Sequence, residues 1–279
     1  MGWREIILEI MREDIGFRDI TTAAVLPKNL EISAEIVAGE EGICAGVEEA
    51  AHVLKNNSLH VKEVMKEGSP MKEGDVILQV SGNSRRLFEA ERTALNIVQR
   101  MSGIATMTDK AVKLAREVNP KAKITCTRKT VLGYLDKKSV EIGGGDPERW
   151  RLDDEIIIKR NHIRIVGSIE ECIHRAKQHV SFTKKICVEV NNSEDALEAA
   201  KNGADVIMFD NMKPADIEKS IKVLKDNNLR DKVLLEVSGG ITLEKVKDYA
   251  KYDVDYISMG CLTHSPKAVD VNMRLLLRE

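Results

Sequence analysis

The chain has 279 residues, and its 43 lysines and arginines nearly balance its 45 aspartates and glutamates, giving a formal net charge of −2. This balance argues against a general nucleic-acid or anionic-membrane binder, which would usually carry a basic excess. No apolar run approaches the roughly 20 residues that a membrane span needs. The five cysteines are scattered and form no CxxC pair, so neither a disulfide framework nor a zinc site is predicted. We therefore expect a cytoplasmic protein that binds no nucleic acid and no membrane.

The N-terminal part is predicted to form a small α+β domain. Apolar residues recur at helical spacing in residues 3–14, and residues 32–38 alternate apolar and polar, as a half-buried strand does. A helix is expected over 46–57, and two short strands are expected within 60–82. A long helix with an apolar face follows, and Gly103 is predicted to break it.

Further along, short apolar segments alternate with helical ones, which is typical of a parallel sheet covered by helices. The strands are expected at residues 123–127, 155–159, 185–190, 205–210, 233–239 and 255–260. Residues that could carry chemistry lie at the ends of these strands, which is where α/β barrels place their active sites. We prefer a closed barrel, although an open doubly wound sheet would give a similar periodicity.

Four cations lie among glycines and at predicted strand ends: Arg128, Lys129, Arg149 and Lys159. Arginine binds carboxylates or phosphates through its planar fork, and lysine adds a compact charge. One such cation is most often a solvated surface charge, whereas four together favour a strongly anionic ligand. Lys159 has a second possible use as a Schiff-base lysine. His162, three residues later, is more simply interpreted as structural.

Two carboxylates and two glycine-containing loops also follow predicted strands. Glu189 and Asp210 could hold sugar hydroxyls or magnesium, which prefers oxygen ligands, or each could pair with a nearby lysine. The loops "SGGI" and "SMGCLTHS" could cradle a phosphate through backbone N–H groups. Alternatively, Gly239 and Gly240 could serve only a tight turn.

Taken in order, these segments resemble the quinolinate phosphoribosyltransferases over essentially the whole chain. The similarity lies in "DITTAAVLP", "ERTALNIVQRMSGIAT", "TRKT", "GGG", "IKRNHI", "VEV", "MFDN", "SGGI" and "SMGCLTHS". It implies an incomplete, seven-stranded α/β barrel with a smaller N-terminal α/β sandwich domain. The implied boundaries are 1–103 for the sandwich with its connecting helix, 104–265 for the barrel, and 266–279 for a C-terminal segment that returns to the first domain.

The resemblance implies a pentosyltransferase that uses magnesium. Its reaction transfers phosphoribose from phosphoribosyl pyrophosphate to quinolinate, with decarboxylation, and gives nicotinate mononucleotide for NAD synthesis. The family's active site is shared within a homodimer, which could assemble further. By resemblance, Arg128, Lys129, Arg149 and Lys159 surround the quinolinate carboxylates, and Arg92 reaches the pocket from the neighbouring subunit.

The resemblance also implies roles for the remaining candidates. Glu189 and Asp210 would hold the ribose hydroxyls and magnesium, directly or through substrate and water, and would act with Lys129 in catalysis. The other implied substrate contacts are Thr127, Ser238, Gly239, Gly240, Gly260 and Cys261.

The chain departs from the family pattern around the implied acceptor pocket. Glu148 stands where the family has histidine, Pro147 where it has asparagine, and Arg160 where it has aspartate. These departures leave two further hypotheses open. One is a paralogue with a different acceptor, of the molybdenum-operon type, and the other is a non-catalytic binder of a phosphoribosyl metabolite.

Overall fold

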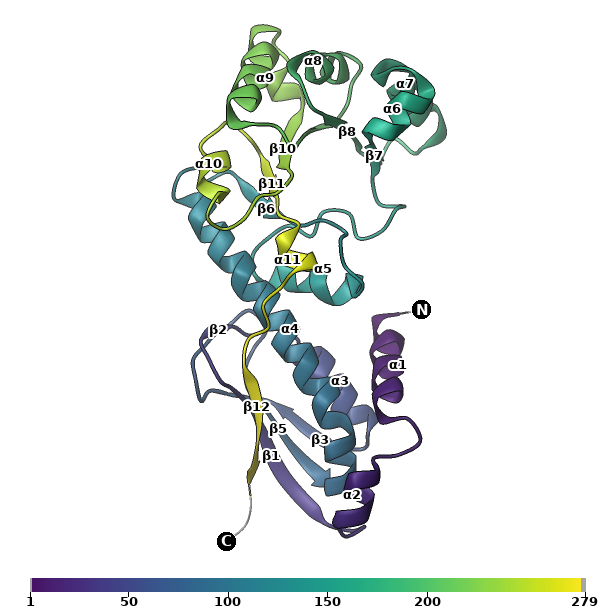
Figure 1. Cartoon of the computed structure of the whole chain (residues 1–279), viewed down its shortest axis with the longest axis vertical. Helices are drawn as coiled ribbons and strands as arrows, with labels where there is room; N and C mark the ends of the chain where they lie inside the picture. The colour runs from purple at the N-terminus through teal and green to yellow at the C-terminus, as the bar shows by residue number, and fades with distance from the viewer. Residues whose placement is uncertain (1, 277–279) are drawn as a thin grey trace. The chain divides into compact units, whose positions relative to one another are not determined.

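The computed structural model describes residues 2–276, which form two compact units (Figure 1). The first unit contains residues 2–109, 131–144 and 265–276, and the second contains 110–130 and 145–264. Residues 131–144 thus pack with the first unit although they lie inside the range expected for the barrel. Met1 and residues 277–279, which belong to the expected N-terminal and C-terminal segments, lie outside the described residues.

The first unit is built on a four-stranded antiparallel sheet with the order β12-β1-β5-β3. Its elements are α1 (Trp3–Ile15), α2 (Ile20–Val25), β1 (Glu31–Ala38), β2 (Gly42–Ile43), α3 (Val47–Asn56), β3 (His60–Glu63), β4 (Pro70–Met71), β5 (Val76–Asn83), most of α4 (Ser84–Arg116), α5 (Gly133–Ile142) and β12 (Val271–Leu276). Three strands rather than two fall within residues 60–83, because β4 makes a short pairing with β2. The apolar sides of α3 and α4 pack with residues of the sheet in one core.

Strand β1 is buried on both faces over residues 34–38, so the prediction of a half-buried strand was wrong for this part. Every residue from Ala34 to Ala38 is buried, including Glu35. The strand is central because β12 and β5 pair with its two edges. Arg274 on β12 donates to the Glu35 carboxylate at 2.7 Å, and Gln79 on β5 donates at 3.1 Å. These two hydrogen bonds lower the pKa of Glu35, so a charged side chain is accommodated on the second face.

Helix α4 continues through Gly103, so the predicted break at this glycine was also wrong. A Cβ at this position would lie 2.0 Å from the carbonyl oxygen of Lys267 and 3.2 Å from the Cα of Ala268. Glycine is therefore needed because the C-terminal segment crosses the helix at backbone contact. The helix tolerates this glycine, whose cost is only about 1 kcal/mol relative to alanine.

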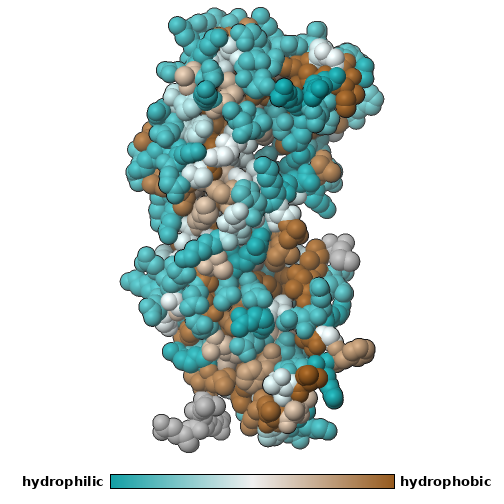
Figure 2. Space-filling view, viewed as in Figure 1, coloured by the Kyte–Doolittle hydropathy of each residue, from teal (hydrophilic) through white to brown (hydrophobic). Residues whose placement is uncertain are grey.

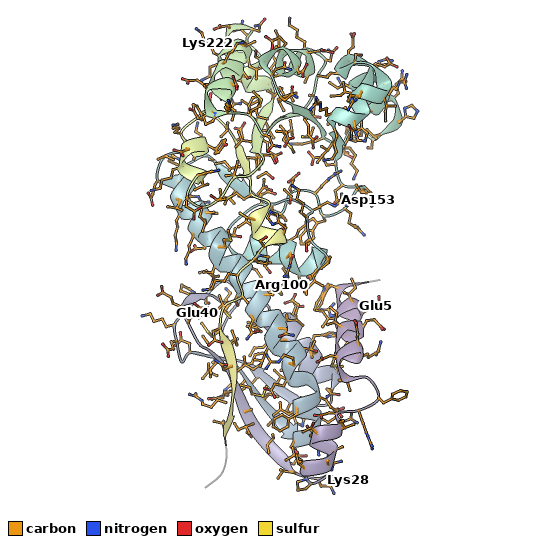
Figure 3. The ribbon with its side chains drawn as sticks, in the orientation of Figure 1. Glu5, Lys28, Glu40, Arg100, Asp153 and Lys222 are labelled. Carbon is orange, nitrogen blue, oxygen red and sulfur yellow. The ribbon has the colours of Figure 1, made fainter. Side chains whose placement is uncertain are left out.

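Helix α5 is held in the first unit by buried ion pairs. The Asp136 side chain is fully buried, and the Arg100 guanidinium on α4 donates to both of its oxygens at 2.7 Å; Figure 3 labels Arg100 where α4 passes α5. Lys138 donates to the buried Glu49 at 2.6 Å and to Glu48 at 2.8 Å on α3. Two neighbouring helices therefore fix α5 through charges.

The second unit is a parallel sheet with the order β6-β11-β10-β9-β8-β7. Its elements are β6 (Lys123–Thr125), β7 (Ile156–Ile158), α6 (Arg160–Val166), α7 (Ile169–His179), β8 (Ile186–Val190), α8 (Ser193–Lys201), β9 (Val206–Asp210), α9 (Pro214–Asp226), η1 (Arg230–Lys232), β10 (Leu234–Ser238), α10 (Val246–Ala250), β11 (Tyr256–Ser258) and α11 (Cys261–His264). All six predicted strands are confirmed. A single parallel bridge between Thr125 and Asp146 stands in place of the seventh.

The barrel is incomplete, in agreement with the expected α/β class. Within residues 2–276 no ladder joins β7 to the segment at Asp146, so these two form the free edges of the sheet. Apolar side chains of Cys187, Val206 and Met208 pack together on the sheet, and the surface over α8 and α9 is mostly hydrophilic (Figure 2). Among the described helices, none is both long and apolar enough to span a bilayer.

Replacing Arg100 with methionine should destabilise the protein, because it removes both guanidinium hydrogen bonds from a carboxylate that is fully buried. Breaking a buried ion pair by removing one partner costs about 3 kcal/mol, which urea denaturation would measure. The matched control is Arg12→Met, since Arg12 and its partner Glu9 are both exposed; exposed pairs contribute little. Equal losses in the two variants would contradict the anchoring role of Arg100.

Replacing Gly103 with alanine should lower the thermal midpoint, although alanine normally stabilises a helix by about 1 kcal/mol over glycine. The new methyl group would meet the Lys267 carbonyl oxygen at 2.0 Å. Gly133→Ala is the control, because Gly133 lies in α5 with no atom within 4 Å of its would-be Cβ; this variant should be unchanged or more stable. A Gly103→Ala protein as stable as the wild type would show that the C-terminal segment can shift away from α4.

Candidate active site

The loop after β6 presents two exposed cations, Arg128 and Lys129. Its backbone is fixed by Thr127, whose hydroxyl accepts the Lys129 N–H at 3.3 Å. The Thr263 hydroxyl on α11 donates to the Thr127 carbonyl oxygen at 3.3 Å. The turn is therefore held by one local hydrogen bond and one from α11, while the two charged side chains remain accessible to a ligand.

Lys159 follows β7 and pairs with Glu189 on β8, with Nζ and Oε1 2.7 Å apart. The alternative that this carboxylate pairs with a lysine is thus confirmed for Glu189. Schiff-base formation needs a neutral amine without a carboxylate partner, so this pairing favours a charge role for Lys159. The His162 ring nitrogen Nδ1 accepts the Lys159 backbone N–H at 3.0 Å, which is the structural role expected of this histidine.

Asp210 and Glu189 lie on the same face of neighbouring strands. Glu189 pairs in register with Met208, and Asp210 is two residues further along β9; residues two apart in a strand share a face. Asp210 is in turn level with Ser238 on β10, and its Oδ1 accepts a hydrogen bond from the Asn211 side chain at 3.0 Å. Two carboxylates and a hydroxyl therefore gather near the carboxyl ends of three adjacent strands.

The two carboxylates suit magnesium only with help from other ligands. Within residues 2–276 no group of three or more His, Cys, Asp and Glu side chains comes together as a metal site. Magnesium demands octahedral coordination but usually keeps several waters, with one or two carboxylates and substrate oxygens completing the set. Glu189 and Asp210 fit that limited contribution.

The turn after β10 requires glycine for its own conformation. Gly239 has a φ of +105°, and a Cβ there would lie 2.4 Å from Oδ1 of Asn211. Gly240 also has a positive φ, of +61°, and the Asn211 N–H donates to the Ser238 carbonyl at 2.9 Å. The turn alone accounts for both glycines, so their contact with a phosphate stays a prediction.

Gly260 and Cys261 lead into α11. The Cys261 thiol is half-buried and contacts the Ile241 carbonyl oxygen at 3.4 Å. Burial raises the pKa of this thiol, which disfavours the reactive thiolate. Any contact of Cys261 with a substrate would therefore use its backbone N–H.

Arg149 is the fourth predicted cation of the site. It lines a cavity of about 270 Å³, together with Glu148 and Glu155, and its Nη1 donates to the Glu155 carbonyl oxygen at 3.2 Å. Neither Arg128 nor Lys159 is among the described residues that line this cavity. Glu148, the departure from the family pattern, has a φ of +55° and faces the same cavity as Arg149.

Arg92 belongs to the first unit, whereas the other predicted site residues belong to the second. It lies on α4 between the buried Ala90 and Ala94, and its own side chain is exposed. The predicted contribution of Arg92 to a neighbouring subunit stays a prediction.

Glu236 is a buried carboxyl that the sequence analysis did not single out. It lies on β10, is 4% exposed, and its Oε1 has no hydrogen-bond partner among the described residues. Burial raises the pKa of Glu236 well above its ordinary value; the charges of Glu148 and Glu155 raise it further, and a hydrogen bond with Ser258 opposes them. A glutamate inside the apolar run "LLEVS" was the available signal.

The chain matches known proteins along almost its whole length. Residues 19–102 match the family described as "Quinolinate phosphoribosyl transferase, N-terminal domain", and residues 104–274 match its C-terminal domain. A probable carboxylating nicotinate-nucleotide pyrophosphorylase of Methanothermobacter thermautotrophicus is 43% identical over 273 residues, or 97% of this chain and 98% of the relative. The human carboxylating enzyme is 32% identical over 248 residues, or 88% of this chain and 83% of the relative.

The fold agrees with these matches. A crystal structure of nicotinate-nucleotide pyrophosphorylase from Ehrlichia chaffeensis superimposes with a TM-score of 0.91 at 32% identity, covering 99% of each chain. Sequence and structure together establish that the chain belongs to the quinolinate phosphoribosyltransferase family.

Proposed function

We propose that this chain transfers phosphoribose from phosphoribosyl pyrophosphate to quinolinate, yielding nicotinate mononucleotide, pyrophosphate and carbon dioxide. The observation that carries the proposal is the shared face of β8 and β9, where Glu189 and Asp210 lie beside Lys159. Relatives that cover nearly the whole chain are named for the carboxylating activity. Both substrates are multiply anionic, which suits a site with cations and oxygen ligands for a metal.

The cations would bind the acceptor by exchanging partners. Lys159 pairs with Glu189 at 2.7 Å and is half-exposed, so an incoming carboxylate can replace Glu189 as its partner. Glu189 would then be released to accept ribose hydroxyls. Arg128 and Lys129 would bind the remaining acceptor charge from their exposed loop, with Lys129 also acting in catalysis. Arg149 would join after turning from the Glu155 carbonyl.

The donor would be held by the backbone groups that follow the strands. Thr127, Ser238, Gly239 and Gly240 would contact the phosphate and ribose, and Gly260 and Cys261 would contribute N–H groups from the start of α11. Asp210 would hold the ribose hydroxyls beside Glu189. Magnesium bound there would neutralise charge on the departing pyrophosphate.

The chemistry then needs orientation more than a protein nucleophile. The pyridine nitrogen attacks ribose C1 as the bond to pyrophosphate breaks, and holding the partners in line can be worth about 7–11 kcal/mol. The nitrogen becomes cationic, so it stabilises the carbanion left when the adjacent carboxylate departs as carbon dioxide. That carbanion takes up a proton to give nicotinate mononucleotide. Fixed cations stabilise the charges that develop.

We also propose a homodimer with a shared site, or a higher assembly of such dimers, in the cytoplasm. Phe17, Ile20 and Val25 of the first unit expose large apolar side chains, with at least 69% of each accessible, and a second subunit could cover them. Arg92 is exposed in the same unit. All five cysteines are free, which suits a reducing compartment.

A different acceptor is the second candidate function. Glu148 adds a carboxylate to the loop that carries Arg149, and two like charges about 4 Å apart repel by roughly 4 kcal/mol at an effective dielectric of 20. A less anionic acceptor would suffer less from this charge than quinolinate does.

The test is an assay for pyrophosphate and carbon dioxide with magnesium, phosphoribosyl pyrophosphate and either quinolinate or nicotinate. We expect both products with quinolinate only. Asp210→Asn should lower kcat/KM about 100-fold or more, since removal of one electrostatic contact at a reacting centre has effects of this size. Asp226→Asn, an equal charge change at the exposed end of α9, should leave activity unchanged.

Other outcomes separate the alternatives. Pyrophosphate release with another pyridine carboxylate, but none with quinolinate, would show that the other carboxylate is the acceptor. Binding of phosphoribosyl pyrophosphate without product from any acceptor would favour a non-catalytic binder.

A shared site predicts complementation between two inactive variants. The Arg92→Ala and Lys159→Ala proteins are mixed and allowed to exchange subunits. The mixture should then recover about one quarter of wild-type activity, because half of random C2 dimers are hybrids and each hybrid has one intact site of two. Each variant mixed with itself is the control. If exchange is verified by differently tagged subunits and no activity returns, each site is built within one chain.

A further inference from the structure

Asn211 is the last residue of the segment "MFDN", and the proposed reaction gives it no role. It directly follows Asp210 at the end of β9 and has a φ of +54°. Residues other than glycine rarely adopt this left-handed conformation, although asparagine does so more readily than most. Glycine would adopt it without steric cost, so the turn alone does not require the side chain of Asn211.

The amide of Asn211 contacts the Asp210 carboxylate. Its Nδ2 donates to Oδ1 of Asp210 at 3.0 Å. An ionised carboxylate can only accept hydrogen bonds, so the NH2 end of the amide must face Asp210. Among the described residues, the Asp210 side chain has no other hydrogen-bond partner, and its second oxygen, Oδ2, is therefore available to a ligand.

The other end of the amide lies against the turn that follows β10. The Asn211 N–H donates to the Ser238 carbonyl oxygen at 2.9 Å, which ties the end of β9 to the end of β10. A Cβ on Gly239 would lie 2.4 Å from Oδ1 of Asn211 and 2.6 Å from its Cγ. The amide thus occupies space that only a glycine at position 239 leaves open, and the backbone of this turn limits its movement.

The consequence is an oriented carboxylate. An aspartate at a strand end can otherwise rotate freely, whereas a hydrogen bond to a charged group is roughly twice as strong as a neutral one and fixes one of the two oxygens. Asp210 is in register with Ser238, so the same hydrogen bonds that hold the turn also hold the carboxylate beside it. Orientation matters here because a displacement of about 1 Å can slow a reaction about 100-fold.

We propose that Asn211 is a positioning residue for donor binding: its amide orients Asp210 so that Oδ2 meets the ribose hydroxyls of phosphoribosyl pyrophosphate. This inference rests on the proposed function, because it deepens the role assigned there to Asp210. Asn211 acts on the donor only through that carboxylate.

The test is isothermal titration of the full-length protein with phosphoribosyl pyrophosphate in the presence of magnesium. Asn211→Gly keeps the left-handed backbone and removes the amide. It should weaken binding at least about tenfold, which is the effect expected when a hydrogen bond to a charged group is lost. The thermal midpoint should match that of the wild type, because the strain relieved at this φ offsets the greater flexibility of glycine in the unfolded chain.

The matched control is Asn228→Gly. Asn228 lies in the loop after α9, is exposed and has a φ of +56°, and the proposed reaction does not use this loop. The same substitution there should leave donor binding unchanged.

A second background separates orientation of Asp210 from support of the turn. In an Asp210→Ala protein the amide has no carboxylate to orient, so adding Asn211→Gly should weaken donor binding by less than about twofold. An equal loss in the wild-type and Asp210→Ala backgrounds would overturn the proposal, because the amide would then act through the turn.

The remaining outcomes separate this proposal from the proposed function. Equal donor affinity of the wild type and Asn211→Gly would overturn the positioning role and leave the proposed function standing. A wild type that does not bind phosphoribosyl pyrophosphate would overturn both. If circular dichroism shows that Asn211→Gly is unfolded, Asn211→Asp carries the test: aspartate also tolerates the left-handed backbone, but its carboxylate cannot donate to Asp210, so binding should again weaken at least about tenfold.

Discussion

The Arg100–Asp136 ion pair fixes helix α5, which connects the two cationic loops in the sequence. Helix α5 begins just after the loop of Arg128 and Lys129 and ends just before the glycines that precede Arg149. Its buried carboxylate accepts two hydrogen bonds from the guanidinium, and removing one partner of a buried ion pair is strongly destabilising. Within the first unit, this ion pair therefore fixes the helix that lies between the two loops in the sequence.

The candidate site also contains an ion pair, but this pair is more accessible to solvent than Arg100–Asp136. Asp136 is fully buried with its arginine partner, whereas the Lys159–Glu189 pair is partly exposed, as the proposed exchange with a substrate carboxylate requires. Pairing orients both groups before binding, and the proposed exchange would need a substrate that offers an equivalent carboxylate. Glu236 is the extreme case, since its Oε1 has no partner among the described residues.

Much of the fold could be predicted because it is encoded locally. The strands β8, β9 and β10 are continuous apolar runs bounded by polar residues, so their positions follow from the sequence. The errors at β1 and Gly103 arose from contacts made by distant segments, Arg274 and Lys267, which no local pattern contains. The same holds for the candidate site. Lys159, Glu189 and Asp210 were found at strand ends, but the cavity that Arg149 lines and the lack of a partner for Glu236 Oε1 among the described residues involve segments far apart in the sequence.

The pairing of β12 with β1 has a consequence for how the protein is made. Glu35 and Arg274 join these strands although they are 239 positions apart, so the ribosome must synthesise the whole second unit before β1 receives its partner. Until then one edge of β1 has unpaired backbone groups, and such edges invite pairing with other chains. Because β12 closes this edge last, the first unit can finish folding only after the second has emerged, and docking of β12 removes the exposed edge.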